Sequence, residues 1–176
     1  MSGFSYMCAD FVLPAVDDTG SVMLSPAQAE EAGLSPPLGL TWAELDPHMP
    51  VLHFSREEDL GELVIRPLPN CPPEVFSQMG YCCEVTLRWT LQRGARLLEY
   101  LQAVIPPGEC LILGSIWLGD CQAPVLENAA LSEITLDVLQ QILDPAEPEY
   151  VWNRGWIISA DPKVSSHDPA RIKPGT

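Results

Sequence analysis

The stretch CLILGSIWLGDCQAP, residues 110–124, is the most apolar passage of the chain and decides how the fold is built. From Leu111 to Leu118, apolar side chains occupy both faces of a pleated strand. This pattern is typical of a central strand that the protein covers on each side, or that a partner covers on one side. Gly119-Asp120 then ends the strand in a turn, because an aspartate side chain can bond nearby backbone amides.

Helices are predicted before and after this strand. Between Thr90 and Ile105, apolar residues recur every three or four positions, and Pro106-Pro107-Gly108 stops the helix. A second helix is expected from the N-cap Thr135 through Leu143. A shorter helix begins at Ser25-Pro26-Ala27-Gln28, where the spacing of serine, proline and glutamine indicates a capping box, and Gly33 ends it.

Short strands account for much of the remaining chain. Alternation of apolar and polar side chains favours a strand over residues 81–89, although Leu87 and Leu91 also fit a helical stripe. The charged segment SREEDLG, residues 55–61, is either a hairpin connection or a single helical turn. The predicted strands are residues 4–13, 51–54, 62–66, 81–89, 111–118, 125–134 and a final pair, 150–152 and 156–158, for which one continuous strand with a glycine bulge is the alternative.

This order of elements predicts an α+β fold: one mixed or largely antiparallel sheet with two principal helices packed on it. A doubly wound fold is disfavoured, because the helices are few and no glycine-rich phosphate loop follows a strand. At 176 residues the chain suits one domain. We expect residues 1–164 to form that domain and residues 165–176, which carry few apolar side chains, to be a flexible tail.

The chain is strongly acidic, with 24 acidic side chains, nine basic ones and a formal net charge of -15. Such a field repels nucleic acid and anionic membrane surfaces, and it speeds the encounter with a basic macromolecule. No window reaches the roughly 18 uninterrupted apolar residues of a spanning helix, and no basic segment precedes the apolar part of the N-terminus. We therefore expect a cytoplasmic protein whose partner is a basic protein.

The chain has six cysteines: Cys8, Cys71, Cys82, Cys83, Cys110 and Cys121. We expect reduced thiols, because the spacing lacks the density of a disulfide scaffold. Zinc ligands usually come as pairs two to four residues apart, whereas Cys82 and Cys83 are adjacent and point to opposite faces of a strand. The sequence therefore predicts no metal site and no other cofactor.

The sequence contains no G-x-S-x-G elbow, P-loop lysine or H-E-x-x-H pair, and no catalytic residue is predicted. Four acids within six residues could supply paired carboxylates, but such a run more often forms a solvated face, which suits an electrostatic contact. Trp42 and Trp156 are expected to be exposed aromatic anchors. The predicted partner-binding residues are Glu57, Glu58, Asp59, Glu62, Trp117, Asp120, Glu147, Glu149 and Trp152.

In its size, its acidity and its lack of a catalytic motif, and in the local phrase Trp117-Leu118-Gly119-Asp120, the chain resembles the cytosolic immunity proteins of bacterial toxin systems. These are small acidic α+β inhibitors that bind one cognate toxin and block its active site. The resemblance implies a binding protein, not an enzyme, that docks onto a basic toxin domain and neutralises it.

Two alternatives stay open. One is a small enzyme or ligand-binding domain whose pocket is assembled from sequence-distant residues such as Asp120, His53 and a cysteine; the other is a housekeeping domain of a larger assembly. A further question concerns Arg93 and Arg96 on the predicted helix. They could form an anion site, although arginines on a helix surface are more commonly paired with neighbouring carboxylates.

Overall fold

The structure is a computed structural model in which residues 3–37, 39–72, 75, 77–117, 123–144 and 153–160 are described. The strands are β1 (Gly3–Ala9), β2 (Val16–Asp17), β3 (Val22–Leu24), β4 (Val51–His53), β5 (Val64–Pro67), β6 (Tyr81–Thr86), β7 (Cys110–Trp117), β8 (Val125–Ala130) and β9 (Arg154–Ser159). The helices are α1 (Pro26–Glu31), α2 (Leu91–Val104) and α3 (Leu136–Leu143), with short 3₁₀ helices η1 (Trp42–Glu44), η2 (Glu57–Gly61) and η4 (Leu131–Glu133).

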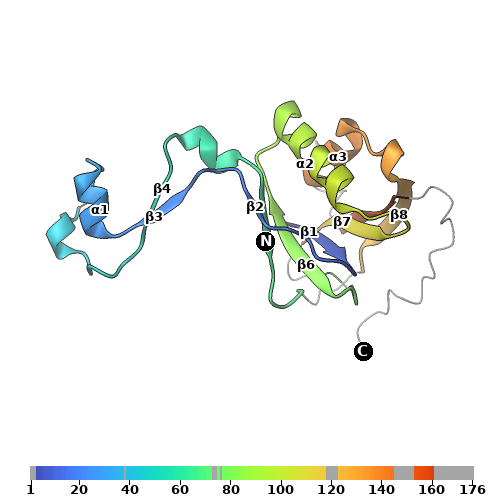
Figure 1. Cartoon of the computed structure of the whole chain (residues 1–176), viewed down its shortest axis with the longest axis horizontal. Helices are drawn as coiled ribbons and strands as arrows, with labels where there is room; N and C mark the ends of the chain where they lie inside the picture. Colours follow the sequence, from blue (N-terminus) through green and yellow to red (C-terminus); the bar gives the residue numbers. More distant parts are fainter. Residues whose placement is uncertain are drawn as a thin grey trace.

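Seven strands form one sheet in the order β2-β5-β6-β1-β7-β9-β8, and β3 and β4 form a separate two-stranded ribbon. Neighbours in the large sheet are antiparallel except β8 and β9, which are parallel. Figure 1 shows α2 and α3 side by side on one face of this sheet. The predicted α+β class, a mixed sheet with two principal helices packed on it, is confirmed.

The apolar stretch forms the central strand β7, which lies between β1 and β9. Its residues from Leu111 to Ile116 are buried, so both faces of the strand are covered, as predicted. Ser115 is the polar exception among them, and its hydroxyl donates a hydrogen bond to the Ile142 carbonyl at 2.8 Å. This bond satisfies a polar group in the core and ties the end of α3 to the sheet.

Side-chain caps fix where the helices begin. The Thr90 hydroxyl accepts a hydrogen bond from the Arg93 N–H at 3.2 Å, and Thr135 accepts one from Val138 at 3.3 Å. Ser25 and Gln28 form the capping box of α1. All three predicted helix starts are confirmed. The face that α2 and α3 bury against the sheet carries Leu97, Leu101, Leu139 and Ile142.

Glycines make room for a large side chain on the other face of the sheet. Tyr6 in β1 is paired with Gly114 in β7, which is in turn paired with Gly155 in β9. A Cβ atom on Gly114 would lie 2.8 Å from the Tyr6 phenol oxygen. The phenol ring is therefore buried against a strand that has no side chain at that point. The other buried residues of this face are Cys8, Val75, Cys82, Ile112, Ile116 and Ile157.

The two predicted strands on either side of residues 55–61 do not pair with each other, as a hairpin would require. β4 pairs with β3, while β5 pairs with β2 and β6, so β4 and β5 do not form a hairpin. The segment between them contains η2, which is the helical-turn alternative. β2 and β3 were not predicted, because two or three residues are too few for an alternating pattern to show. The predicted strand 150–152 and tail 165–176 lie outside the described residues.

Residues 18–62, called the arm below, project from the sheet on the left of Figure 1. The arm holds the β3–β4 ribbon, α1, η1 and η2. Its two limbs meet at the sheet, where the Asp18 N–H donates to the Leu63 carbonyl at 2.9 Å. In the described part of the chain, no helix combines the length and the hydropathy that crossing a membrane requires.

Candidate partner interface

Two arginines of α2 hold the arm at its base. Arg96 Nε donates to a carboxylate oxygen of Asp18 at 3.1 Å, in the limb that leaves β2. Arg93 Nη2 donates to Glu62 Oε1 at 2.7 Å and to the Glu58 carbonyl at 2.8 Å, in the limb that returns to β5. These contacts confirm that the helix arginines pair with neighbouring carboxylates. They line a surface pocket of about 350 Å³, in which Glu99, 3.7 Å from Arg96, adds a third carboxylate to the two arginines.

The Arg93–Glu62 ion pair is the more enclosed of the two. The Arg93 side chain is 11% exposed and that of Glu62 is 37% exposed. The hydrogen bond from Arg93 lowers the pKa of the Glu62 carboxyl, and the same bond raises the pKa of Arg93. Glu62 is thus held in its charged form by a residue of the same chain, and its role is to fix the arm.

The four acidic residues of the predicted run therefore differ in whether their carboxylates are free to contact a partner. Asp59 accepts a hydrogen bond from the Arg56 N–H at 3.0 Å and so caps η2. Glu62 is paired with Arg93. Glu57 and Glu58 have exposed side chains. A partner can reach the carboxylates of Glu57 and Glu58 and leave the Asp59 cap and the Glu62–Arg93 pair intact.

Trp117 is the remaining predicted residue in the described part of the chain. It is half-buried at the end of β7, and its backbone N–H donates to Asn153 Oδ1 at 3.0 Å. The strand register puts Trp117 and Val64, where the arm returns, at the same end of the sheet. With two strands between them, they are separated by about 14 Å at the usual strand spacing. Predicted residues that lie outside the described part are Asp120, Glu147, Glu149 and Trp152.

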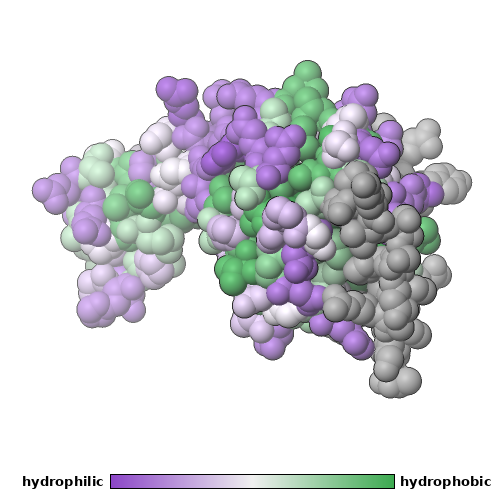
Figure 2. Space-filling view, turned by 45° about the vertical axis from the view of Figure 1, so that its right-hand side comes forward, coloured by the Kyte–Doolittle hydropathy of each residue, from purple (hydrophilic) through white to green (hydrophobic). Residues whose placement is uncertain are grey.

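The arm also gathers exposed apolar side chains, which the sequence pattern did not single out. Met23 and Leu52 are cross-strand partners in the β3–β4 ribbon and are 60% and 52% exposed. Figure 2 shows apolar surface on the arm, interrupted by hydrophilic residues. Of the ten large apolar side chains exposed in the described residues, more than half lie in the arm: Val22, Met23, Leu40, Met49, Leu52 and Leu60.

Little of the arm is buried within the arm itself. Between residues 20 and 56, the buried residues of the described chain are Pro26 and Ala29. An isolated two-stranded ribbon is only marginally stable in water, because it has no third layer to cover its apolar face. In the arm, α1 packs beside β3, yet Met23 and Leu52 of the ribbon stay 60% and 52% exposed. A partner that covers the ribbon would supply the missing layer.

The predicted aromatic anchors do not have the exposure that was expected of them. Trp42 is half-buried, and its indole N–H donates to the Leu34 carbonyl at 3.2 Å, which joins η1 to the end of α1. Trp156 lies in β9 and packs against the core under the helices. Both rings are used to build the fold. The apolar side chains that the arm exposes are methionine, leucine and valine instead.

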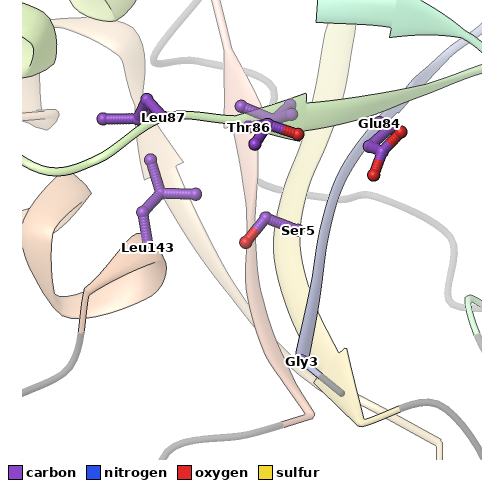
Figure 3. A pocket seen from close by; sticks show the side chains of 7 residues that line it. Gly3, Ser5, Glu84, Thr86, Leu87 and Leu143 are labelled. Carbon is purple, nitrogen blue, oxygen red and sulfur yellow. The ribbon is translucent and has the colours of Figure 1, made fainter. Parts of the chain in front are cut away.

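A second pocket, of about 240 Å³, opens where β1 and β6 approach the end of α3. In Figure 3 the Ser5 hydroxyl points to the side on which Leu143 lies. This hydroxyl is 2.8 Å from the Ser115 hydroxyl, and Glu84 is the titratable residue among those that line the pocket. Of the alternative site built from Asp120, His53 and a cysteine, His53 lies in the arm, in β4, and Asp120 lies outside the described residues.

Sequence reasoning missed one cluster of reactive side chains. Cys8, Cys71 and Cys82 meet on the sheet face opposite the helices. Alternation along β1 and β6 could have placed Cys8 and Cys82 together, but no local pattern reveals that the segment carrying Cys71 folds over them. Shared hydrogen bonds with these two thiols lower the pKa of Cys71 to about 4, and they raise the pKa of Cys8. As expected, Cys83 faces the other way, into the helix-covered core.

Searches of protein families, curated proteins and solved structures found no match to this chain. The function is therefore inferred from the geometry of the chain itself.

Proposed function

We propose that this protein is an acidic binding protein that neutralises a basic protein partner, and that the arm is the surface that docks. The observation that carries the proposal is the coincidence of exposed apolar side chains and negative charge on one projecting unit. The arm contains nine acidic side chains and one basic one, Arg56. Its net charge of -8 is more than half of the -15 carried by the whole chain.

The apolar and acidic side chains of the arm are of the kinds that form a protein interface. Interfaces commonly have an apolar centre that is desolvated on binding and a polar rim. Met23 and Leu52 supply such a centre on the ribbon. Glu30 and Glu31 at the end of α1, which packs beside β3, and Glu44 of η1, which packs beside α1, are exposed and add negative charge to the same arm. Lysine or arginine side chains that surround an apolar patch on the partner would match this arrangement.

Methionine suits such a contact because its unbranched side chain adapts to irregular surfaces. Met23 and Met49 are 60% and 49% exposed on the arm. Long-range attraction between the acidic arm and a basic partner would raise the association rate, and apolar burial would then slow dissociation. A cognate toxin whose active site holds cationic groups is a partner of this chemistry. We therefore propose an immunity protein as the specific form of the binding function.

The proposal is tested by capture of the partner from the source cells with the tagged full-length chain. Three baits are compared: the natural chain, the arm variant M23S/L52S, and the control variant L91S/V125S. The control changes two side chains of similar exposure, 66% and 63%, that lie outside the arm. We expect a basic protein to be retained by the natural chain and the control, lost by the arm variant, and released as salt is raised.

Retention of the same protein by M23S/L52S, or a captured partner of acidic composition, would contradict the docking proposal. The immunity function is tested separately, by expression of the captured protein alone in a host cell. Growth arrest that the natural chain relieves and M23S/L52S does not relieve supports inhibition of a toxin. Normal growth of the host with the captured protein alone would contradict the immunity function and leave binding by the arm in place.

A further inference from the structure

The three clustered thiols come from different parts of the chain. Cys8 of β1 and Cys82 of β6 are register partners, and Cys71 lies in the connection between β5 and β6. The Cys71 and Cys82 Sγ atoms are 3.0 Å apart, the Cys8 and Cys71 Sγ atoms are 4.0 Å apart, and all three lie within 4.8 Å of one another. Three sulfurs thus converge on one point on the sheet face opposite the helices.

Ordinary packing does not account for this convergence. Buried cysteines often act as small apolar side chains, and atoms that merely pack lie about 3.5–4.0 Å apart. The Cys71–Cys82 distance of 3.0 Å is shorter than that. The surroundings are mostly apolar, with Ile112, Val75 and Met79 on the same face, and the buried Tyr6, whose pKa is raised by burial and further by these thiols, is also part of this cluster. These surroundings leave the thiols few partners other than each other, or an ion that binds all of them.

We propose that Cys8, Cys71 and Cys82 form a three-thiolate site for a soft, thiophilic metal ion of the zinc or copper(I) class. Sulfur ligands select these ions over magnesium or calcium, which prefer oxygen. Binding would release the thiol protons to solvent, since the thiolate is the form that ligates a metal. The site does not depend on the arm, so it is independent of the proposed partner.

The distances suit such an ion after a small adjustment. Two sulfurs that each lie 2.3 Å from a tetrahedral zinc ion are about 3.8 Å apart, and in a trigonal site they are about 4.0 Å apart. The Cys8–Cys71 distance of 4.0 Å already matches. Cys71 and Cys82 would separate by less than about 1 Å to reach the same spacing. Because Cys71 is only partly buried, the ion has a route to the site from its side.

A disulfide between Cys71 and Cys82 is the competing explanation for their short separation. It would use two of the three sulfurs and give no reason for Cys8 to lie beside them, fully buried. One ion accounts for all three. The two explanations also differ in mass: a disulfide removes two hydrogens, whereas a bound ion adds its own mass and is lost to a chelator.

The full-length protein, reduced and stripped of metal by a chelator, is titrated with Zn²⁺, with Cu(I) and with Co²⁺ as a spectroscopic probe. Each complex is then examined by native mass spectrometry. We expect one Zn²⁺ or one Cu(I) per chain, and a sulfur-to-cobalt charge-transfer band with Co²⁺. The variants C71S and C82A should lose this binding, and C83A should keep it. Cys83 is the matched control, because it is adjacent to Cys82 but faces the other side of β6.

Circular dichroism of each variant identifies any that fails to fold, and C71S, at the least buried position of the three, is the gentlest change. Failure of the folded natural chain to bind any of the three ions would overturn the proposal. So would equal binding by C71S and C83A, or a natural chain that resists reduction because it contains a Cys71–Cys82 disulfide.

Discussion

The guanidinium of Arg93 and the carboxylate of Glu62 meet at 2.7 Å across the junction between the sheet and the arm. Arg93 lies in the first turn of α2, whose position is fixed by the Thr90 cap and by packing on the sheet. The same guanidinium also donates to the Glu58 carbonyl, in η2. The direction of the arm is therefore set by a helix that belongs to the main core.

Replacement of Arg93 by glutamine should loosen the arm and spare the sheet. The shorter amide cannot reach Glu62 and the Glu58 carbonyl together, and we expect a loss of about 1–2 kcal/mol in the free energy of unfolding. Hydrogen exchange should rise in residues 56–63 and stay unchanged in β7. R96Q is the control, because Arg96 is 51% exposed and its loss should cost less than about 0.5 kcal/mol. An equal effect of the two substitutions would contradict this role of Arg93.

The attachment of the arm should weaken in acid. The pKa of Glu62 is lowered from its ordinary value of 4.5 by the hydrogen bond from Arg93. The stabilisation is therefore fully present above that ordinary value, and it is lost as the pH falls through the lowered pKa. In limited proteolysis of the arm, E62Q should be cut faster than the natural chain at pH 7, and this difference should vanish in acid. A difference that persists unchanged at low pH would contradict the assignment.

The glycine beneath Tyr6 should not tolerate a larger residue. In G114A the new Cβ would meet the Tyr6 oxygen and the Arg154 carbonyl, each at 2.8 Å. Since the backbone of a central strand cannot move far, we expect a loss of about 1–3 kcal/mol in the free energy of unfolding. G80A is the control, because a Cβ on Gly80 meets nothing within 4 Å. Denaturant melts measure the free energy of unfolding of both variants. If G114A is as stable as the natural chain, the Tyr6 ring can move aside and the prediction is wrong.

The elements that the sequence predicted best are those specified by local chemistry. The side chains of Ser25, Thr90 and Thr135 each cap a helix by accepting a hydrogen bond from the backbone N–H three positions on, so the signal lies within one turn. The central strand was also predictable, since a strand that is apolar on both faces must be covered on both sides. Such features can be recognised without knowledge of their distant partners.

Pairings between distant segments could not be predicted in the same way. No local feature of the sequence near Val51 or Val64 indicates that their strand partners are Leu24 and Asp17. Strands of two or three residues are too short for an alternating pattern to reveal the pairing. The acidic run forms a helical turn, which was one of the two alternatives that the sequence left open. The division between Glu62, held by Arg93, and the exposed Glu57 depends on a helix some thirty residues away. The Cys71 cluster was missed for the same reason.

The most direct test of the docking proposal is the rate at which the captured partner associates with E57Q/E58Q, measured by stopped flow at low salt. This variant removes two exposed charges of the arm and leaves the Asp59 cap and the Glu62–Arg93 pair in place. E109Q/E127Q removes two exposed charges outside the arm, and a thermal melt shows that each variant is folded. We expect association to slow about fivefold in the arm variant and less than about twofold in the control, with both effects fading at high salt. Equal rates for the two variants would contradict the proposal that the acidic arm is where the partner binds.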